Sequence, residues 1–122
     1  MAQFDDQVLK WNQSTKIWNG PVGGNVTALT DALTINVDPT KGNVFTLTPA
    51  GSDTINVVKV IPGQELTLII TTSGVTSYTL TFGTGFKSTG ALATGTVSGK
   101  VFSISFISDG VNYNESARTT AM

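Results

Sequence analysis

The chain has no cysteine and no histidine among its 122 residues, and both absences exclude classes of protein. Without cysteine there is no disulfide and no thiol nucleophile, and without histidine a Ser-His-Asp arrangement cannot be built. The usual nitrogen and sulfur ligands of zinc are missing too. No Asp-x-Asp-x-Asp spacing marks a calcium loop. We therefore expect no catalytic residues, no cofactor and no metal, and a protein that is not an enzyme.

Charge is also scarce. Charged residues make up 12% of the chain, against about 25% in an average domain. The net charge of −1 leaves no basic surplus to neutralise phosphates, so we expect no nucleic-acid partner. No apolar run reaches the roughly 18 to 20 residues that a membrane helix needs. The opening residues, Met1 to Asp6, have neither the basic nor the apolar region of a signal peptide. We expect neither membrane binding nor export.

Threonine, serine and asparagine take the place of charged residues, and short strand-like segments carry most of the apolar ones. β-Branched threonine fits a pleated surface, and turn-forming clusters of Gly, Pro, Asp and Ser separate the segments. Spacings of about 8 to 12 residues predict an all-β fold, an antiparallel β-sandwich or jelly-roll-like barrel. The predicted strands are Val26 to Thr30, Leu33 to Val37, Val44 to Thr48, Thr54 to Val60, Glu65 to Thr72, Ser77 to Phe82, Val101 to Ser108 and Asn112 to Arg118.

The chain divides into two regions, residues 1–24 and residues 25–122. The first holds both tryptophans and ends in the breaker cluster Asn19-Gly-Pro-Val-Gly-Gly24, so we interpret it as an N-terminal arm. Leu9 to Trp18 has the pattern of a short hairpin, although a short helix from Asp5 is the competing interpretation. The second region is the folded β body.

Three features of the body make further predictions. Strict alternation in two neighbouring segments predicts a hairpin across Thr72 to Thr76. Gly83 to Gly99 is a long Gly-, Thr- and Ser-rich segment, and a loop of that length is usually functional or mobile. We expect Phe86 and Leu92 to point inward and anchor it. Its glycines do not form a phosphate loop, since no Gly-Lys-Ser/Thr follows.

The final segment predicts a hairpin. Alternation from Val101 to Ser108 places Phe102, Ile104 and Phe106 on the core face. Asp109-Gly110 then reverses the chain, because glycine accepts the positive φ of a tight turn. These last residues match F-x-S-D-G-x-x-Y-x-E-x-x-R.

That hairpin resembles the C-terminal end of small all-β structural modules in phage virions. The preceding segment, of the form G-x-x-F-K-S-T-G-x-L-A-T-G, is similar to the lead-in of the same modules, and the resemblance covers about the last 60 residues, from Gly63 onward. Leu9 to Trp18 resembles a short segment of phage fibre proteins. Such modules occur in head-decoration proteins and in fibre proteins, so the resemblance implies a virion building part.

The first functional hypothesis is a decoration (cement) protein. It would be made in the host cytoplasm and would bind the major capsid protein on the outer surface of the phage head, as a homotrimer. Two tryptophans in a short arm suggest anchoring on another chain, where aromatic residues are enriched. The proposed anchors are Phe4, Leu9, Trp11, Ile17 and Trp18.

The alternative is a receptor- or carbohydrate-binding module of a tail fibre or baseplate. Exposed tyrosines would then stack on sugar rings, whereas the plainer interpretation packs Tyr78 and Tyr113 in the sheet. A chain of 122 residues beginning at Met1 is short for a fibre, which counts against this hypothesis.

The final hairpin supplies the remaining candidate residues. Asp109 and Gly110 form the turn, and Tyr113, Glu115 and Arg118 are candidates for polar contacts between subunits. Glu115 and Arg118 are three positions apart, so on a regular strand they face opposite sides and can pair only if a bulge intervenes. Asp109 and Glu115 could form a carboxylate pair of glycosidase type, but a turn residue and a strand residue is the simpler interpretation.

Overall fold

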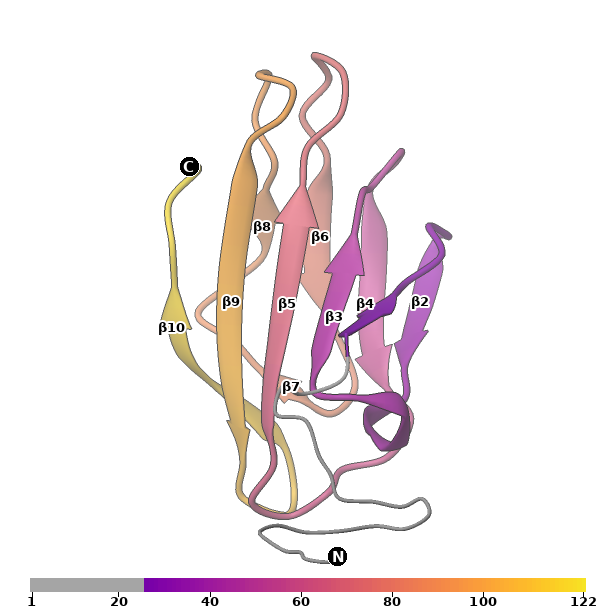
Figure 1. The fold of residues 1–122 in the computed structure, drawn as a ribbon, viewed down its shortest axis with the longest axis vertical. Helices are drawn as coiled ribbons and strands as arrows, with labels where there is room; N and C mark the ends of the chain where they lie inside the picture. The colour runs from indigo at the N-terminus through magenta and orange to yellow at the C-terminus, as the bar shows by residue number, and fades with distance from the viewer. Residues whose placement is uncertain (1–25) are drawn as a thin grey trace, which may run out of the picture.

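The computed structural model describes residues 26–122 (Figure 1). The predicted arm, with Phe4, Leu9, Trp11, Ile17 and Trp18, lies outside the described residues. The described chain is all-β apart from one 3-10 turn, which confirms the all-β part of the predicted fold class. Its elements are β1 (Val26–Ala28), β2 (Thr34–Val37), η1 (Pro39–Lys41), β3 (Val44–Leu47), β4 (Asp53–Val57), β5 (Glu65–Thr71), β6 (Thr79–Phe82), β7 (Phe86–Lys87), β8 (Leu92–Ala93), β9 (Val101–Ser108) and β10 (Tyr113–Arg118).

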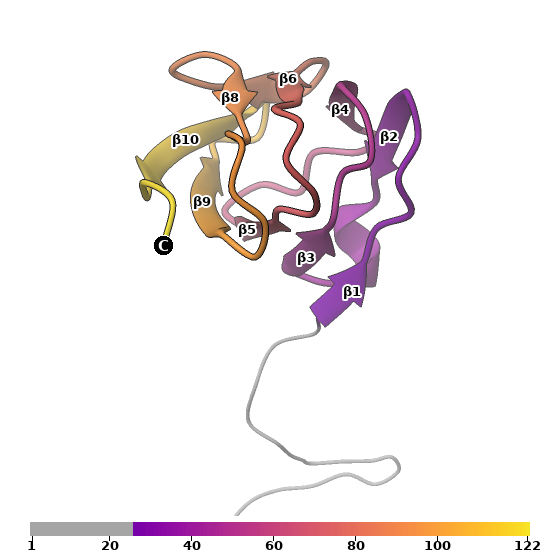
Figure 2. The ribbon, with the colours of Figure 1, turned by 90° about the horizontal axis from the view of Figure 1, so that it is seen from above.

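The strands form two sheets that face each other, as the view from above shows (Figure 2). The six-stranded sheet, which we call sheet A, has the order β1-β3-β5-β9-β10-β7. The four-stranded sheet, sheet B, has the order β2-β4-β6-β8. From β1 to β8 the chain therefore crosses from one sheet to the other after every strand.

This alternation makes most strand pairs parallel. In sheet A, β1 pairs with β3 and β3 with β5 in parallel, and in sheet B the pairs β2–β4 and β4–β6 are parallel as well. Antiparallel pairing is confined to β5–β9, β9–β10 and β6–β8. The predicted antiparallel jelly roll is thus not what the pairings show, because successive turns of chain stack on each other as in a solenoid.

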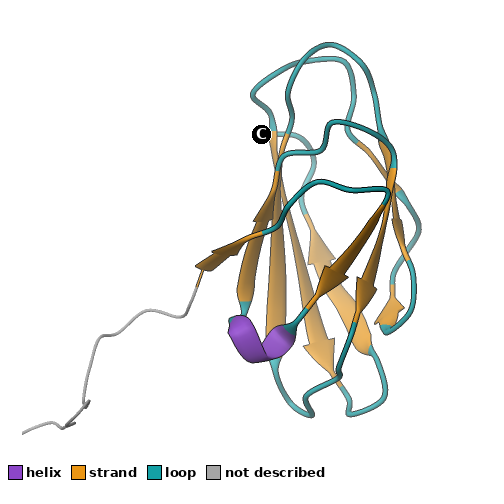
Figure 3. Cartoon of the chain, turned by 90° about the vertical axis from the view of Figure 1, so that its right-hand side faces the viewer, coloured by secondary structure: helices purple, strands orange, loops and turns teal. Residues whose placement is uncertain are grey.

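The connections explain the difference from the prediction. The sequence predicts a hairpin across Thr72 to Thr76, but residues 72–78 cross from β5 in sheet A to β6 in sheet B, so that prediction is wrong. Pro39 and Pro49 are buried within other crossings, and η1 occupies one of them at the end of the sheets (Figure 3). A short polar connection between two alternating strands looks the same in sequence whether it folds the chain back within a sheet or carries it to the facing one.

The core lies between the sheets and confirms the predicted strand faces. In β9, Phe102, Ile104 and Phe106 are buried, while Ser103 and Ser105 between them are half-exposed. The buried apolar set is Ile35, Val37, Phe45, Leu47, Ile55, Val57, Leu66, Leu68, Ile70, Leu80, Phe86, Leu92, Phe102, Ile104, Phe106 and Tyr113. These side chains come from both sheets, so each sheet buries one face against the other.

The Gly-rich segment is less irregular than expected. It contains β7 and β8, and Phe86 and Leu92 are buried in the core, as predicted. Its glycines allow close approach to β4. A Cβ on Gly85 would lie 2.9 Å from Cβ of Val57, and Gly85 also has a φ of +87° that other residues rarely adopt.

Candidate functional site

The turn of the last hairpin is built by the Asp109 side chain. Its carboxylate accepts hydrogen bonds from the backbone N–H groups of Val111 (2.8 Å) and Asn112 (2.9 Å). Those bonds, from Asn112 first and then Val111, lower the pKa of Asp109 to about 2. Gly110 supplies the positive φ of 92°. Asp109 and Gly110 both have the turn role that the sequence indicated. The Asp109 carboxylate is engaged in hydrogen bonds with the backbone of its own loop.

Tyr113 is fully buried, and its hydroxyl links β10 to the loop that precedes β5. Its hydroxyl donates to Oε1 of Gln64 and accepts from the N–H of Ile61 at 3.2 Å. Gln64 in turn donates to the carbonyl of Pro39 at 3.1 Å. Tyr113 is therefore a structural residue within one chain and offers no ring to a sugar or to another subunit.

A β-bulge brings Glu115 and Arg118 to the same side of β10. Glu115 lies opposite Phe106, and Arg118 lies opposite Ile104, because the register shifts between Glu115 and Ala117. Phe106 and Ile104 are two apart and share a face of β9. The bulge that would allow Glu115 and Arg118 to pair is thus present, and the two residues pair within one chain.

The Arg118 guanidinium donates hydrogen bonds both to Glu115 and to the loop between β7 and β8. Its Nη2 donates to Oε1 of Glu115 at 2.8 Å and its Nε donates to Oε2 at 3.1 Å. The same guanidinium donates to the carbonyls of Gly90 (2.8 Å) and Ala91 (3.2 Å). Glu115 also accepts from the N–H of Thr89 at 3.1 Å and from its hydroxyl at 3.0 Å. Both carboxylate oxygens of Glu115 and all three guanidinium nitrogens of Arg118 therefore have hydrogen-bond partners.

The electrostatics of this cluster are those of a satisfied structural pair. Only 5% of the Glu115 side chain is exposed. That burial raises the pKa of Glu115, but hydrogen bonds from Arg118 and Thr89 outweigh it, so the pKa lies below its ordinary value. Asp109 and Glu115 have separate sets of partners, and the structure does not join them as the carboxylate pair considered from the sequence. We call the cluster of Glu115, Arg118, Thr89, Gly90 and Ala91 the terminal lock.

A second polar feature was missed by the sequence analysis. Asp53 begins β4 with only 4% of its surface exposed, on the same inward side as Ile55 and Val57. It contacts the carboxyl group of Asp31, and burial together with this neighbour raises the pKa of Asp53 to about 6. The signal was present, because Asp53, Ile55 and Val57 keep the two-residue period of a strand. The predicted strand begins at Thr54, one residue later than β4, which leaves Asp53 in the preceding turn.

The outward faces of the two sheets differ. On sheet A, the outward side chains of β3, β5 and β9 are uncharged apart from Glu65 at one end of β5. They are Val44, Thr46, Thr67, Ile69, Thr71, Val101, Ser103, Ser105 and Ile107. On sheet B, outward threonines and asparagines lie in register across neighbouring strands, with Thr34 beside Thr54 and Asn36 beside Asn56.

Among residues 26–122, no group of three or more acidic, histidine or cysteine residues is placed to hold a metal ion. No helix in the same range has the length and apolar character needed to span a bilayer. The sequence matches no protein-family model, no curated protein and no solved structure.

Proposed function

We propose that this protein is a decoration (cement) protein that binds the outer surface of a phage head as a homotrimer and stabilises the shell. The observation that carries the proposal is the terminal lock. It joins the two segments of the phage-module resemblance, which are separate in sequence, through Arg118, Glu115 and Thr89. Arg118, Glu115 and Thr89 of the resembling segments are thus engaged with one another within the fold.

The uncharged outward face of sheet A supports an assembly role. Its valine, isoleucine, threonine and serine side chains are mostly half-exposed, so they can bury area against a neighbour without desolvating a charge. Interface cores are depleted of charged residues in the same way. In the proposal this face meets another subunit, while Phe4, Leu9, Trp11, Ile17 and Trp18 insert into the major capsid protein as anchors.

A co-sedimentation experiment tests the proposal. Purified protein is mixed with mature phage shells or with host cells, and each mixture is pelleted. We expect saturable binding to shells in a fixed ratio to the capsid subunits. A variant that lacks residues 1–20 should keep the circular dichroism spectrum of the full chain and lose shell binding. Full binding by this variant would contradict the role of the anchors, and no binding of the full chain to any shell would contradict the proposal.

A receptor- or carbohydrate-binding module of a tail fibre or baseplate is the second candidate, and the outward face of sheet B favours it. Aligned threonine hydroxyls and the Asn36 amide form a regular array of hydrogen-bonding groups at Thr34, Thr54, Thr81 and Asn36, whereas Oδ1 of the neighbouring Asn56 already accepts from the N–H of Thr84. Binding to host cells or to a glycan array, lost in Thr34→Val and Thr81→Val, would select this function. Both replacements keep β-branching and remove only the hydroxyl group.

A further inference from the structure

β2 is an edge strand of sheet B, and in the described part of the chain no strand pairs with its outer side. The carbonyls of Leu33 and Val37 accept hydrogen bonds at 2.9 Å and 3.0 Å from N–H groups in and just after β4. Because backbone groups alternate in direction along a strand, those of Thr34 and Asn36 point to the outer side instead. They offer donors and acceptors to a further strand.

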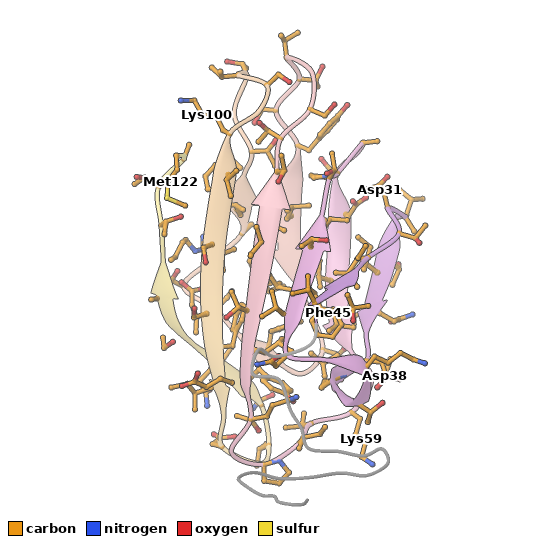
Figure 4. The ribbon with its side chains drawn as sticks, viewed as in Figure 1. Asp31, Asp38, Phe45, Lys59, Lys100 and Met122 are labelled. Carbon is orange, nitrogen blue, oxygen red and sulfur yellow. The ribbon has the colours of Figure 1, made fainter. Side chains whose placement is uncertain are left out.

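This edge lacks the features that discourage pairing. Natural edge strands often carry charges, prolines or bulges that keep other strands away. β2 has the sequence Thr-Ile-Asn-Val and pairs with β4 without a register shift. The nearest charged residues in sequence, Asp31 and Asp38, lie beyond its two ends on this side of the molecule (Figure 4). A further strand can therefore continue the sheet here.

The strands beside this edge repeat in sequence and in structure. β2 and β4 both contain Thr-Ile-Asn-Val, and the two copies pair in parallel, residue for residue. Residues 26–30 and 44–48 both have the pattern Val-x-x-Leu-Thr, and β1 pairs with β3 at the offset of 18 residues that aligns Val26 with Val44. Each sequence repeat is therefore one coil stacked on the next.

The same offset of 18 residues extends the repeat toward the N-terminus. Residues 16–30 and residues 34–48 are identical at seven of 15 aligned positions. The identical pairs are Ile17 and Ile35, Pro21 and Pro39, Gly24 and Gly42, Asn25 and Asn43, Val26 and Val44, Leu29 and Leu47, and Thr30 and Thr48. Residues 34–48 run from β2 through η1 to β3. Residues 16–30 therefore have the sequence of a strand in sheet B, a crossing and then β1.

We propose that residues 16–19 of the same chain, which precede the described part, occupy this edge as a strand parallel to β2, with Ile17 beside Ile35. The chain can reach this position, because six residues separate the segment from β1 and six separate β2 from β3. Pro21 in the first connection matches Pro39, which is buried in the second. Residues 16–19 are therefore the sheet B strand of a coil that comes before β1.

The register decides which side chains this strand buries. In β2 the second and fourth residues are buried, and the first and third are exposed. Ile17 therefore faces inward beside Ile35 at the open end of the core, whereas Lys16 and Trp18 point to solvent. The inference does not rest on the proposed function. Where both hold, Ile17 is held by its own chain, and Trp18 stays available as an anchor on the shell.

Pairs of introduced cysteines test the register, because the chain has no cysteine of its own. Lys16→Cys with Thr34→Cys puts two thiols side by side on neighbouring strands, within the Cα distance of about 4.4–6.8 Å that a disulfide needs. Oxidation with diamide should join them within one chain. The yield should be close to that of Thr34→Cys with Thr54→Cys, since Thr34 and Thr54 pair directly in sheet B.

Lys16→Cys with Thr81→Cys is the matched control. Thr81 lies on β6 in line with Thr54, so it is three strands from the added strand, or about 14 Å at the usual strand spacing. This pair should not form a disulfide. The proposal is overturned if the first pair forms none, or if both pairs form it equally. A disulfide between two chains, seen as a dimer on a non-reducing gel, would place the segment on a second copy and also overturns it.

The thermal midpoint of the full-length protein gives an independent measurement. Ile17→Ala removes apolar contacts with the core and should lower the midpoint by about 4 °C or more. Lys16→Ala changes the outward side of the same strand and should move it by less than about 2 °C. Equal midpoints of the two variants would contradict the inward position of Ile17. None of these measurements involves shells, so their failure leaves the co-sedimentation test of the proposed function unaffected.

Discussion

Asp53 links the stability of the protein to pH. Its pKa is about 6 in the folded state and 3.8 without burial and Asp31, so the folded protein holds the proton more tightly than the unfolded chain. The stabilisation is complete below pH 3.8 and is lost as the pH rises through about 6. We expect the free energy of unfolding to fall by about 1–3 kcal/mol between pH 4.5 and pH 7. Urea titrations at a series of pH values measure it.

Asp53→Asn provides the control for this pH dependence. The amide does not titrate, so the variant should lose the decline between pH 4.5 and pH 7. The lowered pKa values of Asp38, Asp109 and Glu115 act in the opposite direction, since the stability they contribute is lost only as the pH falls toward their folded-state values. An unchanged slope in the variant would show that another group causes it. From the absence of histidine alone, a flat stability profile from about pH 6 to 8 is expected, whereas Asp53 moves the start of the plateau above about pH 7.

Tyr113 gives a second prediction at the residue scale. Tyr113→Phe keeps the buried ring and leaves Oε1 of Gln64 and the N–H of Ile61 without their partner. We expect a loss of about 1–3 kcal/mol in the free energy of unfolding, measured in urea. Tyr78→Phe is the matched control, because the described chain shows no hydrogen bond from the Tyr78 hydroxyl, and it should change stability by less than about 0.5 kcal/mol. Equal effects of the two replacements would contradict the bridging role.

Single residues were predictable where strand alternation decided their side. Phe102, Ile104 and Phe106 in β9 and the anchors Phe86 and Leu92 lie in the core as the sequence indicated. The partners of polar side chains were not predictable, because they are distant in sequence. Gln64 meets Tyr113, and Thr89 meets Glu115, only after the sheets have formed.

Among the elements, the terminal lock determines how firmly β10 is held to the β7–β8 loop. Arg118→Ala leaves the buried Glu115 carboxylate without its fork and the carbonyls of Gly90 and Ala91 without a donor. We expect a loss of about 2–4 kcal/mol, because breaking a buried pair leaves an uncompensated charge. Arg118→Lys should restore only part of it, since an ammonium group cannot form the fork.

The matched control for the lock is Lys87→Ala, which removes an exposed cation from β7. It should leave the urea midpoint within about 0.5 kcal/mol of the unaltered protein. Adding Glu115→Gln to Arg118→Ala should recover part of the lost stability, because the unpaired charge is then absent. A simple sum of the two single effects would argue against direct coupling.

Gly85 tests the close approach of the β6–β7 connection to β4. Gly85→Ala would place a Cβ 2.9 Å from Val57 and would also adopt an unfavourable positive φ, so we expect a loss of about 2–4 kcal/mol. Gly74 has a similar φ of +74° and open space around it, so Gly74→Ala should show the backbone effect alone, about 1 kcal/mol. Equal losses in thermal unfolding would mean that packing on Val57 is unimportant.

At the scale of the elements, the positions of the strands were predictable from the sequence, but their pairing was not. All eight predicted strand segments contain strands, because alternation and turn residues are local signals. The pairing was wrong for β1 to β6, since a local pattern does not distinguish a hairpin from a crossing to the facing sheet. The last hairpin was predicted because Asp109-Gly110 is a local turn signal; in the structure the N–H of Asp109 donates to the carbonyl of Asn112, and Gly110 and Val111 form the tip of the turn.

For the whole molecule, low charge predicts low sensitivity to salt. The part of the chain that the structure describes has one ion pair, and it is largely shielded from water. Surface pairs contribute at most about 1 kcal/mol, so the thermal midpoint should move by less than about 4 °C between 0.05 M and 0.5 M NaCl. Calorimetric scans at constant pH measure it. A larger shift would mean that charged groups outside the described residues contribute to stability.

The order of the strands in sheet A has a consequence for synthesis on the ribosome. β5, near the middle of the chain, has β9 as one neighbour, and the loop before β5 bonds to Tyr113 of β10. The centre of the sheet therefore cannot close until almost the last residue has emerged from the exit tunnel. A nascent chain that is released before β9 has been made therefore leaves one edge of β5 without its hydrogen-bonding partner.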